Sequence, residues 1–195
     1  MRERADLLMP FLALLLGAVV GALTSVLQTG LDFPWLALVN AVSPWLTTAF
    51  VAGALQSRLR TAVWTGLLAT FVQVVAYYAV AELRGYDASV YYLVFWSLCA
   101  VVGGPVFGGV GHAWRHASPA GPGAAALPAA FLSEAVVTYW IVLGYRSSAV
   151  LFGAVAVVLA VSLGAYRHQY RPMLRWIGPA LLAGLAGTAG LALVA

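Results

Sequence analysis

Glu134 is the residue with the most evident chemical potential in this 195-residue chain, because it is the one acid inside a long apolar segment. A carboxyl in such a position is costly to keep and by default marks a functional site. At about 1.5 Å per residue, Glu134 lies roughly 16 Å from the outer end of its predicted helix, near the middle of a bilayer. Two interpretations are open. The carboxyl carries a proton or binds a cationic or hydrogen-bonding solute, or it is a neutral group bonded to a neighbouring helix.

Further polar and aromatic side chains lie in the outer half of other predicted membrane segments. Gln73 shares a helix face with Tyr77, and Glu134 shares one with Thr138, because residues four apart in a helix are neighbours. A few polar groups among aromatic walls are the usual composition of a small-molecule pocket. We therefore predict an outward-open pocket whose substrate-binding residues are Asn40, Gln73, Trp96, Glu134 and Thr138.

Pro44 interrupts the segment that contains Asn40. A proline removes the helical hydrogen bond to the carbonyl four residues earlier, and here that carbonyl belongs to Asn40. In one interpretation, the kink presents the side chain and the backbone of Asn40 to a ligand. In the other, it is a packing kink whose freed groups are satisfied by Ser43 or by a neighbouring helix.

Small residues recur every four positions on the first apolar segment, at Ala13, Gly17 and Gly21. Such a face lets two helix backbones approach closely. One interpretation is that these three residues dock a partner membrane subunit. The other is that they pack against another helix of the same protein. The stretch 103–109, with Gly104 and Gly108 four apart, has the same character.

The sequence contains no recognisable catalytic motif. It has no HExxH, no GxSxG, no glycine-rich phosphate loop and no pair of acids for an aspartyl protease. His112, His116 and His168 all lie at the predicted cytoplasmic border, away from Glu134. The single Cys99 excludes an internal disulfide and a cysteine metal cluster. We therefore expect no enzyme activity, no cofactor and no metal site.

The elements that must position these residues are membrane helices. Hydrophobic residues make up 63% of the chain, and its ten basic and six acidic residues cannot cover the surface of a soluble fold of this size. A membrane helix needs about 20 mostly apolar residues. We predict an all-α polytopic helical bundle, a single integral membrane domain over residues 1–195, with seven spans at 7–28, 34–55, 61–81, 90–114, 124–145, 149–166 and 176–195.

The arginines predict the orientation, because positively charged loops stay in the cytoplasm. With the N-terminus inside, eight arginines lie on the inner side, and only Arg84 and Arg146 lie outside. Seven spans then place the C-terminus outside. All basic residues are arginine, which is typical of a GC-rich bacterial genome, so we expect a multi-pass protein of the bacterial inner membrane.

The stretches 21–28, 40–45, 49–53 and 103–111, with Trp114-Arg115, resemble an uncharacterised family of small actinobacterial multi-pass membrane proteins. That resemblance covers most of the first four predicted spans and implies no activity. The chain's size, the small-residue face of its first segment and its outer polar cluster are also similar to the substrate-binding S components of energy-coupling-factor vitamin transporters. This looser likeness implies an outward pocket and a docked coupling subunit, although those proteins usually have six spans and seven are predicted here.

The leading hypothesis is a membrane-embedded subunit that binds or transports a small solute through an outward-facing pocket. The alternative is a structural or assembly protein that acts through its Gly/Ala helix-packing faces. The partners expected are the lipid bilayer, a small-molecule solute, and a membrane partner subunit or a second copy of the chain. The basic residues stand singly or in pairs between apolar segments, so we expect no nucleic-acid partner.

Overall fold

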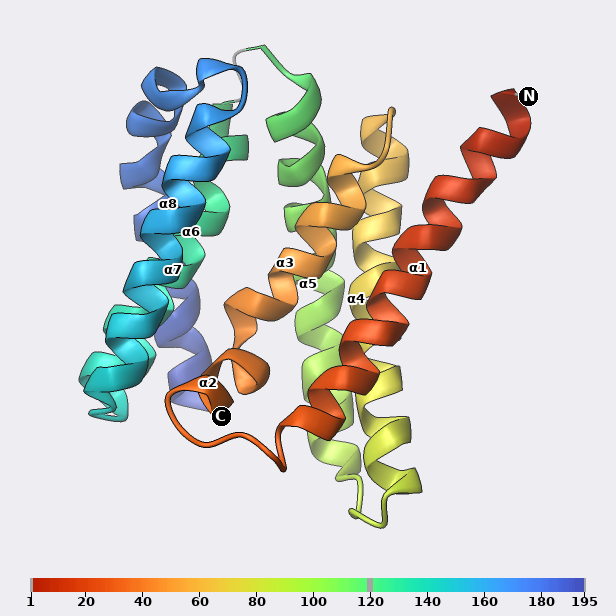
Figure 1. Ribbon diagram of the computed structural model, residues 1–195, viewed down its shortest axis with the longest axis vertical. Coiled ribbons are helices and arrows are strands. Elements are labelled where there is room, and N and C mark those ends of the chain that lie inside the picture. Colours follow the sequence, from red (N-terminus) through yellow and green to blue (C-terminus); the bar gives the residue numbers. More distant parts are fainter. Residues whose placement is uncertain (1, 119–120, 195) are drawn as a thin grey trace. The chain divides into compact units, whose positions relative to one another are not determined.

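The computed structural model describes residues 2–118 and 121–194, and every regular element in those ranges is a helix. In chain order they are α1 (Arg2–Leu27), α2 (Trp35–Asn40), α3 (Val42–Ala54), α4 (Leu59–Leu83), α5 (Val90–His116), the 3₁₀ helix η1 (Gly121–Ala124), α6 (Ala126–Glu134), the π-helix η2 (Ala135–Val142), α7 (Arg146–Ala165), the 3₁₀ turn η3 (Tyr166–His168) and α8 (Tyr170–Val194) (Figure 1). The prediction of an all-α fold is confirmed for these residues.

Four helical segments are long and apolar enough to cross a membrane. They are Leu8–Leu27, Leu59–Leu83, Val90–His116 and Arg146–His168, which match the predicted spans 7–28, 61–81, 90–114 and 149–166. Large apolar side chains are exposed along these helices, and on α1 they form a stripe at Phe11, Leu15, Val19 and Leu23. An apolar surface of this extent belongs in lipid, so the chain is a helical membrane protein.

Of two other predicted spans, one is interrupted and one contains a shorter helix. The segment 34–55 is not one helix, because α2 ends at Asn40, Ala41 is extended with φ −104° and ψ 157°, and α3 begins at Val42. The interruption that Pro44 predicts is therefore present, because proline removes the helical hydrogen bond to the carbonyl of Asn40. The segment 124–145 holds the shorter apolar run Ala126–Val142, in which α6 passes into η2.

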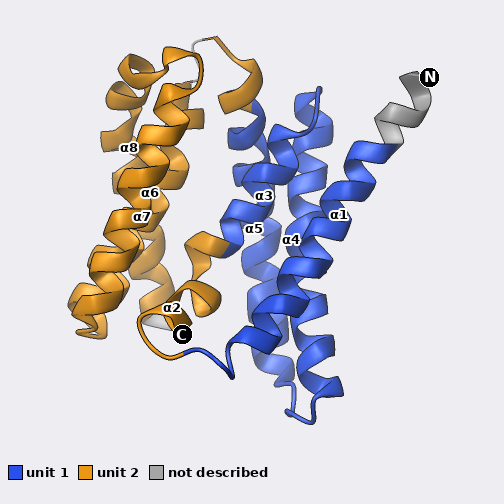
Figure 2. Ribbon diagram, in the orientation of Figure 1, with its two compact units in different colours: residues 1–31, 45–112 blue, residues 32–44, 113–195 orange. Residues whose placement is uncertain are grey.

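The chain divides into two compact units (Figure 2). Unit 1 comprises residues 1–31 and 45–112, and unit 2 comprises residues 32–44 and 113–195. The last predicted span, 176–195, overlaps α8 of unit 2, which begins earlier, at Tyr170. The broken segment contributes α2 and the first residues of α3 to unit 2 and the rest of α3 to unit 1.

In unit 1, α1 packs in parallel against α4 along its small residues (Figure 1). A Cβ atom added to Gly17 would lie 2.2 Å from the carbonyl oxygen of Ala69, and one added to Gly21 would lie 2.1 Å from that of Gln73. Both distances are far below a van der Waals contact, so only glycine permits this approach. Ala13 is fully buried in the same cluster as Ala69. The three residues considered for partner docking are therefore covered by a helix of the same chain, as the packing alternative expects.

A second glycine contact joins α5 to α4 in unit 1. A Cβ atom added to Gly108 would lie 2.4 Å from the carbonyl oxygen of Ala62, and one added to Gly104 would lie 2.8 Å from the Cα atom of Leu67. The pairing runs in opposite chain directions, so α4 and α5 are antiparallel. Close backbone approach, rather than large interlocking side chains, holds this unit together.

In unit 2, α6 packs against both α7 and α8, and η2 continues along α7. The fully buried Phe152 of α7 contacts Phe131 and Tyr139, with ring centroids 5.6 Å and 4.7 Å apart. On the other side, Ser133 lies against Gly184 of α8, where an added Cβ atom would meet the serine Oγ at 2.4 Å. The segment that carries Glu134 is thus held from two sides.

The glycine seam between α1 and α4 leads to a stability prediction. We expect Gly21→Ala to lower the melting temperature in detergent, because the new methyl group overlaps a backbone carbonyl and overpacking costs about 1–3 kcal/mol. Gly153→Ala on α7 is the matched control, since nothing lies within 4 Å of its added Cβ atom. The control should melt at or slightly above the wild-type temperature. A Gly21→Ala variant as stable as the control would show that α1 does not pack on α4 in this way.

Candidate functional site

The candidate site is the break between α2 and α3 in unit 2. Pro44 is the third residue of α3, and its missing N–H is harmless there, because the first N–H groups of a helix have no partner within it. The N–H groups of Val42 and Ser43 do need partners. Inside a membrane, each backbone polar group left unsatisfied costs several kcal/mol.

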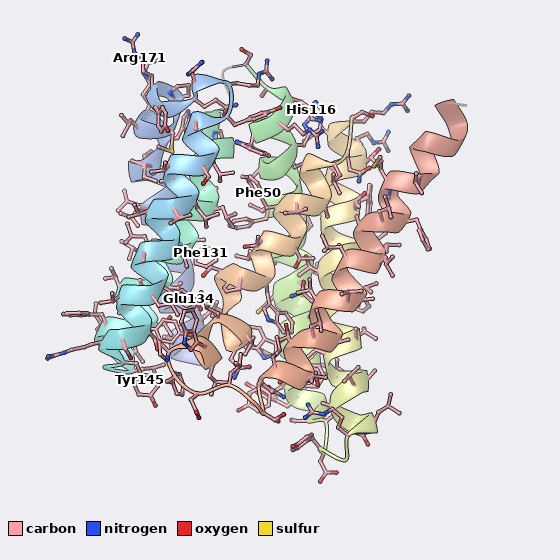
Figure 3. All side chains as sticks on the ribbon, viewed as in Figure 1. Phe50, His116, Phe131, Glu134, Tyr145 and Arg171 are labelled. Carbon is pink, nitrogen blue, oxygen red and sulfur yellow. The ribbon has the colours of Figure 1, made fainter. Side chains whose placement is uncertain are left out.

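Glu134, which is labelled in Figure 3, satisfies both of these N–H groups. Its Oε1 accepts a hydrogen bond from the backbone N–H of Val42 at 3.0 Å, and its Oε2 accepts one from that of Ser43 at 2.8 Å. The Ser43 hydroxyl also donates to Oε2. Glu134 is only 3% exposed, so these three donors take the place of water around its carboxyl group. The positive end of the α3 dipole adds to the attraction.

Tyr139 satisfies the other side of the break. Its hydroxyl donates to the carbonyl oxygen of Ala37 at 3.3 Å, and this carbonyl belongs to the last turn of α2, where helical acceptors lose their donors. Tyr139 is buried, with its ring against Phe152. One segment therefore supplies an acceptor to the start of α3 and a donor to the end of α2.

The π-helix η2 explains how Glu134 and Tyr139 reach the same break. The two residues are five apart, and in an α-helix with about 3.6 residues per turn they would be rotated by roughly 140° from each other. A π-helix bonds residue i to residue i+5, which brings residues five apart onto one face. In this segment the N–H of Leu143 donates to the carbonyl oxygen of Thr138, five residues earlier, at 2.9 Å.

Three of the five predicted substrate-binding residues lie in the unit that contains the break. Glu134 binds the start of α3, as described above. Asn40 is the exposed last residue of α2, directly before the extended Ala41. Thr138 is half-buried in η2, one turn beyond Glu134.

The other two predicted residues belong to unit 1. Gln73 is completely buried on α4, where its backbone faces Gly21 of α1, and among the described residues neither of its amide atoms has a hydrogen-bond partner. Trp96 is half-buried on α5 and contacts the ring of Phe95 with centroids 5.0 Å apart. Both residues therefore belong to a different unit from Glu134, and the structure does not test whether they share a site with it.

Sequence reasoning missed the groups that Glu134 binds and the role of Tyr139. The sequence does contain a signal for the N–H groups that Glu134 binds. A proline in the first turn is typical of a helix start, and Val42 and Ser43 directly precede Pro44. The π-helix that aligns Tyr139 with Glu134 has no comparable signature in the sequence.

The arrangement can exchange hydrogen-bond partners. A solute with an acceptor group can replace the carboxyl on the N–H groups of α3, and a solute with a cationic or donor group can bind the carboxyl itself. Either exchange would keep the N–H groups of Val42 and Ser43 paired.

The chain belongs to a family of unknown function, DUF6518, whose model matches residues 2–195. This agrees with the predicted resemblance to an uncharacterised family. No curated protein and no solved structure matches the chain. Since the family has no assigned activity, the function must be argued from the site itself.

The three hydrogen bonds on Glu134 lead to a prediction about Glu134→Gln. The amide keeps the size of the side chain but turns one acceptor into a donor, which then faces an N–H group of α3. Leaving a buried donor unsatisfied costs about 1–3 kcal/mol, so we expect a clearly lower melting temperature in detergent. Ser43→Ala removes one of the three donors and should cost less, about 1 kcal/mol.

The matched control is Glu82→Gln on α4. Glu82 is exposed and accepts one hydrogen bond, from the backbone N–H of Ala88 at 3.1 Å. We expect its replacement to leave the melting temperature nearly unchanged. If Glu134→Gln were as harmless as this control, the carboxyl would not be holding the start of α3.

Proposed function

We propose that the protein is a membrane-embedded subunit that binds or transports a small solute, with its site at the break between α2 and α3. The observation that carries the proposal is a discontinuous helix whose first N–H groups bind the buried Glu134. Discontinuous helices whose ends face charged groups form the substrate sites of many secondary transporters. Irregular backbone at membrane depth is tolerated where it is buried in protein or lines a cavity, and here it coincides with a buried acid.

The neighbouring side chains supply further groups for a solute. Asn40 is exposed beside the break and offers both a donor and an acceptor, and Thr138 offers a hydroxyl one turn from Glu134. The proposal rests on these three residues of unit 2. Gln73 and Trp96 stay predictions from the sequence. We propose binding and transport rather than catalysis.

The alternative, an assembly protein acting through Gly/Ala faces, has less support. Gly17 and Gly21 are occupied by α4, and Gly104 and Gly108 are occupied by the same helix from the other side. A face that already packs within the chain is not open to another subunit. The exposed apolar stripe on α1 is the kind of surface that lipid covers.

We further propose seven crossings of the bacterial inner membrane, with the N-terminus in the cytoplasm and the C-terminus outside. In addition to the four long apolar segments, the crossings are the broken pair α2–α3, the continuous run α6–η2, and α8. Eight arginines on the inner side against two on the outer side support this orientation.

The solute proposal is tested by purifying the protein in native-lipid discs and identifying retained small molecules by mass spectrometry. The identified solute should raise the melting temperature. We expect Asn40→Ala to weaken its binding about tenfold without changing the melting temperature of the free protein, because Asn40 is exposed. Thr188→Ala is the control, since that hydroxyl donates to the carbonyl oxygens of Gly184 and Leu185 on its own helix. Retention of no solute above empty discs would contradict the proposal.

The topology is tested by reporter fusions. A reporter after the C-terminus should be active outside the cell, and one inserted in the segment 166–175 should be active in the cytoplasm. The reason is the concentration of arginines in that segment. A cytoplasmic C-terminus would overturn the seven crossings and favour six.

A further inference from the structure

Four arginines and two histidines gather at one end of unit 2, where α5 ends and α7 turns into α8. All six are exposed: Arg115, His116, Arg167, His168, Arg171 and Arg175. Figure 3 shows His116 and Arg171 at this end and Tyr145 at the other. The acids of unit 2 are Asp32, which precedes α2, and Glu134, which is buried at the break. The cationic end thus contains no acidic residue of its own unit.

The turn that presents these charges is strained. Arg167 and His168 both have left-handed backbone conformations, with φ of 54° and 56°. Each such residue costs of order 1–2 kcal/mol when it is not glycine, and such strain is typically found at functional sites. The turn is held in place by the side-chain amide of Gln169, which donates to the carbonyl oxygen of Trp114 at 3.0 Å, and by Arg167, which donates to that of Arg115 at 3.1 Å.

The start of α8 adds two further positive charges to this turn. The bond from Arg167 places its guanidinium on the backbone of another arginine. Arg171 and Arg175 are four apart at the start of α8, so they lie on one helix face and repel each other. An anion with several acceptor oxygens would relieve this repulsion, and arginine pairs well with phosphate.

The surroundings of the cluster favour a phosphate that carries acyl chains. Large apolar and aromatic side chains next to the arginines are exposed: Leu174 is 67% exposed, and Tyr170 and Trp176 are 41% and 45% exposed. Tyrosine and tryptophan in such positions are typical of the boundary between headgroups and hydrocarbon. A free phosphate ion would use the arginines alone and leave this apolar border unused.

We propose that this end of unit 2 is a binding site for the headgroups of anionic phospholipids, with Arg167, Arg171 and Arg175 as the phosphate ligands. Basic pockets between membrane helices on the cytoplasmic side recognise such headgroups, and each arginine near the surface adds to the attraction. The site is separate from the break that holds Glu134, and it does not rest on the proposed transport function.

The test uses the full chain in a neutral detergent, with phosphatidylglycerol as the probe and phosphatidylcholine as the uncharged reference. Native mass spectrometry should show at least tenfold preferential retention of phosphatidylglycerol, and this lipid alone should raise the melting temperature. Inorganic phosphate at millimolar concentration should give no such rise. Equal retention of both lipids would overturn the proposal, and a rise with inorganic phosphate would show a site for soluble anions instead.

The variant Arg171→Gln/Arg175→Gln removes two charges from exposed positions and should lower the preference for phosphatidylglycerol about tenfold or more. Arg146→Gln is the matched control, because Arg146 is an exposed arginine of the same unit that lies over the ring of Trp140. It should keep the full preference. Should the double variant fail to fold, each single variant is measured in the same way. An unchanged preference in the folded double variant, or in both single variants, would also overturn the site.

Discussion

The break in the helix between Asn40 and Val42 imposes the constraint on which the rest of unit 2 depends. A membrane interior has no water to bind the N–H and carbonyl groups that such a break sets free. The segment α6–η2 supplies partners on both sides of the break. Glu134 accepts hydrogen bonds from the first N–H groups of α3, and the Tyr139 hydroxyl donates one to a carbonyl in the last turn of α2. The π-helix serves the same need, because its wider turn brings two residues five apart towards one face. The packing of α6 on α7 and α8 then keeps both side chains in position.

The two units are stabilised by different means. In unit 1, glycines let α1, α4 and α5 approach until their backbones touch, and the contacts along these helices are regular. In unit 2, a broken helix, a π-helix and a strained turn at Arg167 interrupt the regular pattern. Each irregularity is tied by side-chain hydrogen bonds to specific partners. Such costly features are typically found where a membrane protein binds something, which is why both proposed sites lie in unit 2.

Much of the fold could be predicted from composition, and the site could be predicted only in part. Four of the seven predicted spans coincide with long apolar helices, because helix length and apolarity are read directly from the residues. Pro44 predicts an interruption of the span 34–55, but apolarity carries no information on whether the helix bends or breaks there, and the structure shows a break at Ala41. Glu134 was singled out by its charge. Its partners were not, because they are backbone groups of Val42 and Ser43. Gln73 was grouped with Glu134 by depth alone, and depth does not tell which helix a residue faces.

The hydrogen–deuterium exchange rates of the Val42 and Ser43 amides test the central claim most directly. The first N–H groups of a helix ordinarily exchange fast, because they have no partner within it. Because Glu134 accepts a hydrogen bond from each of these two amides, we expect them to exchange slowly in the wild-type protein. In Glu134→Ala the same two amides should exchange at least tenfold faster, while amides further along α3 keep their protection. Fast exchange of the Val42 and Ser43 amides in the wild-type protein would contradict the account, because the buried carboxyl would then not be holding the broken helix together.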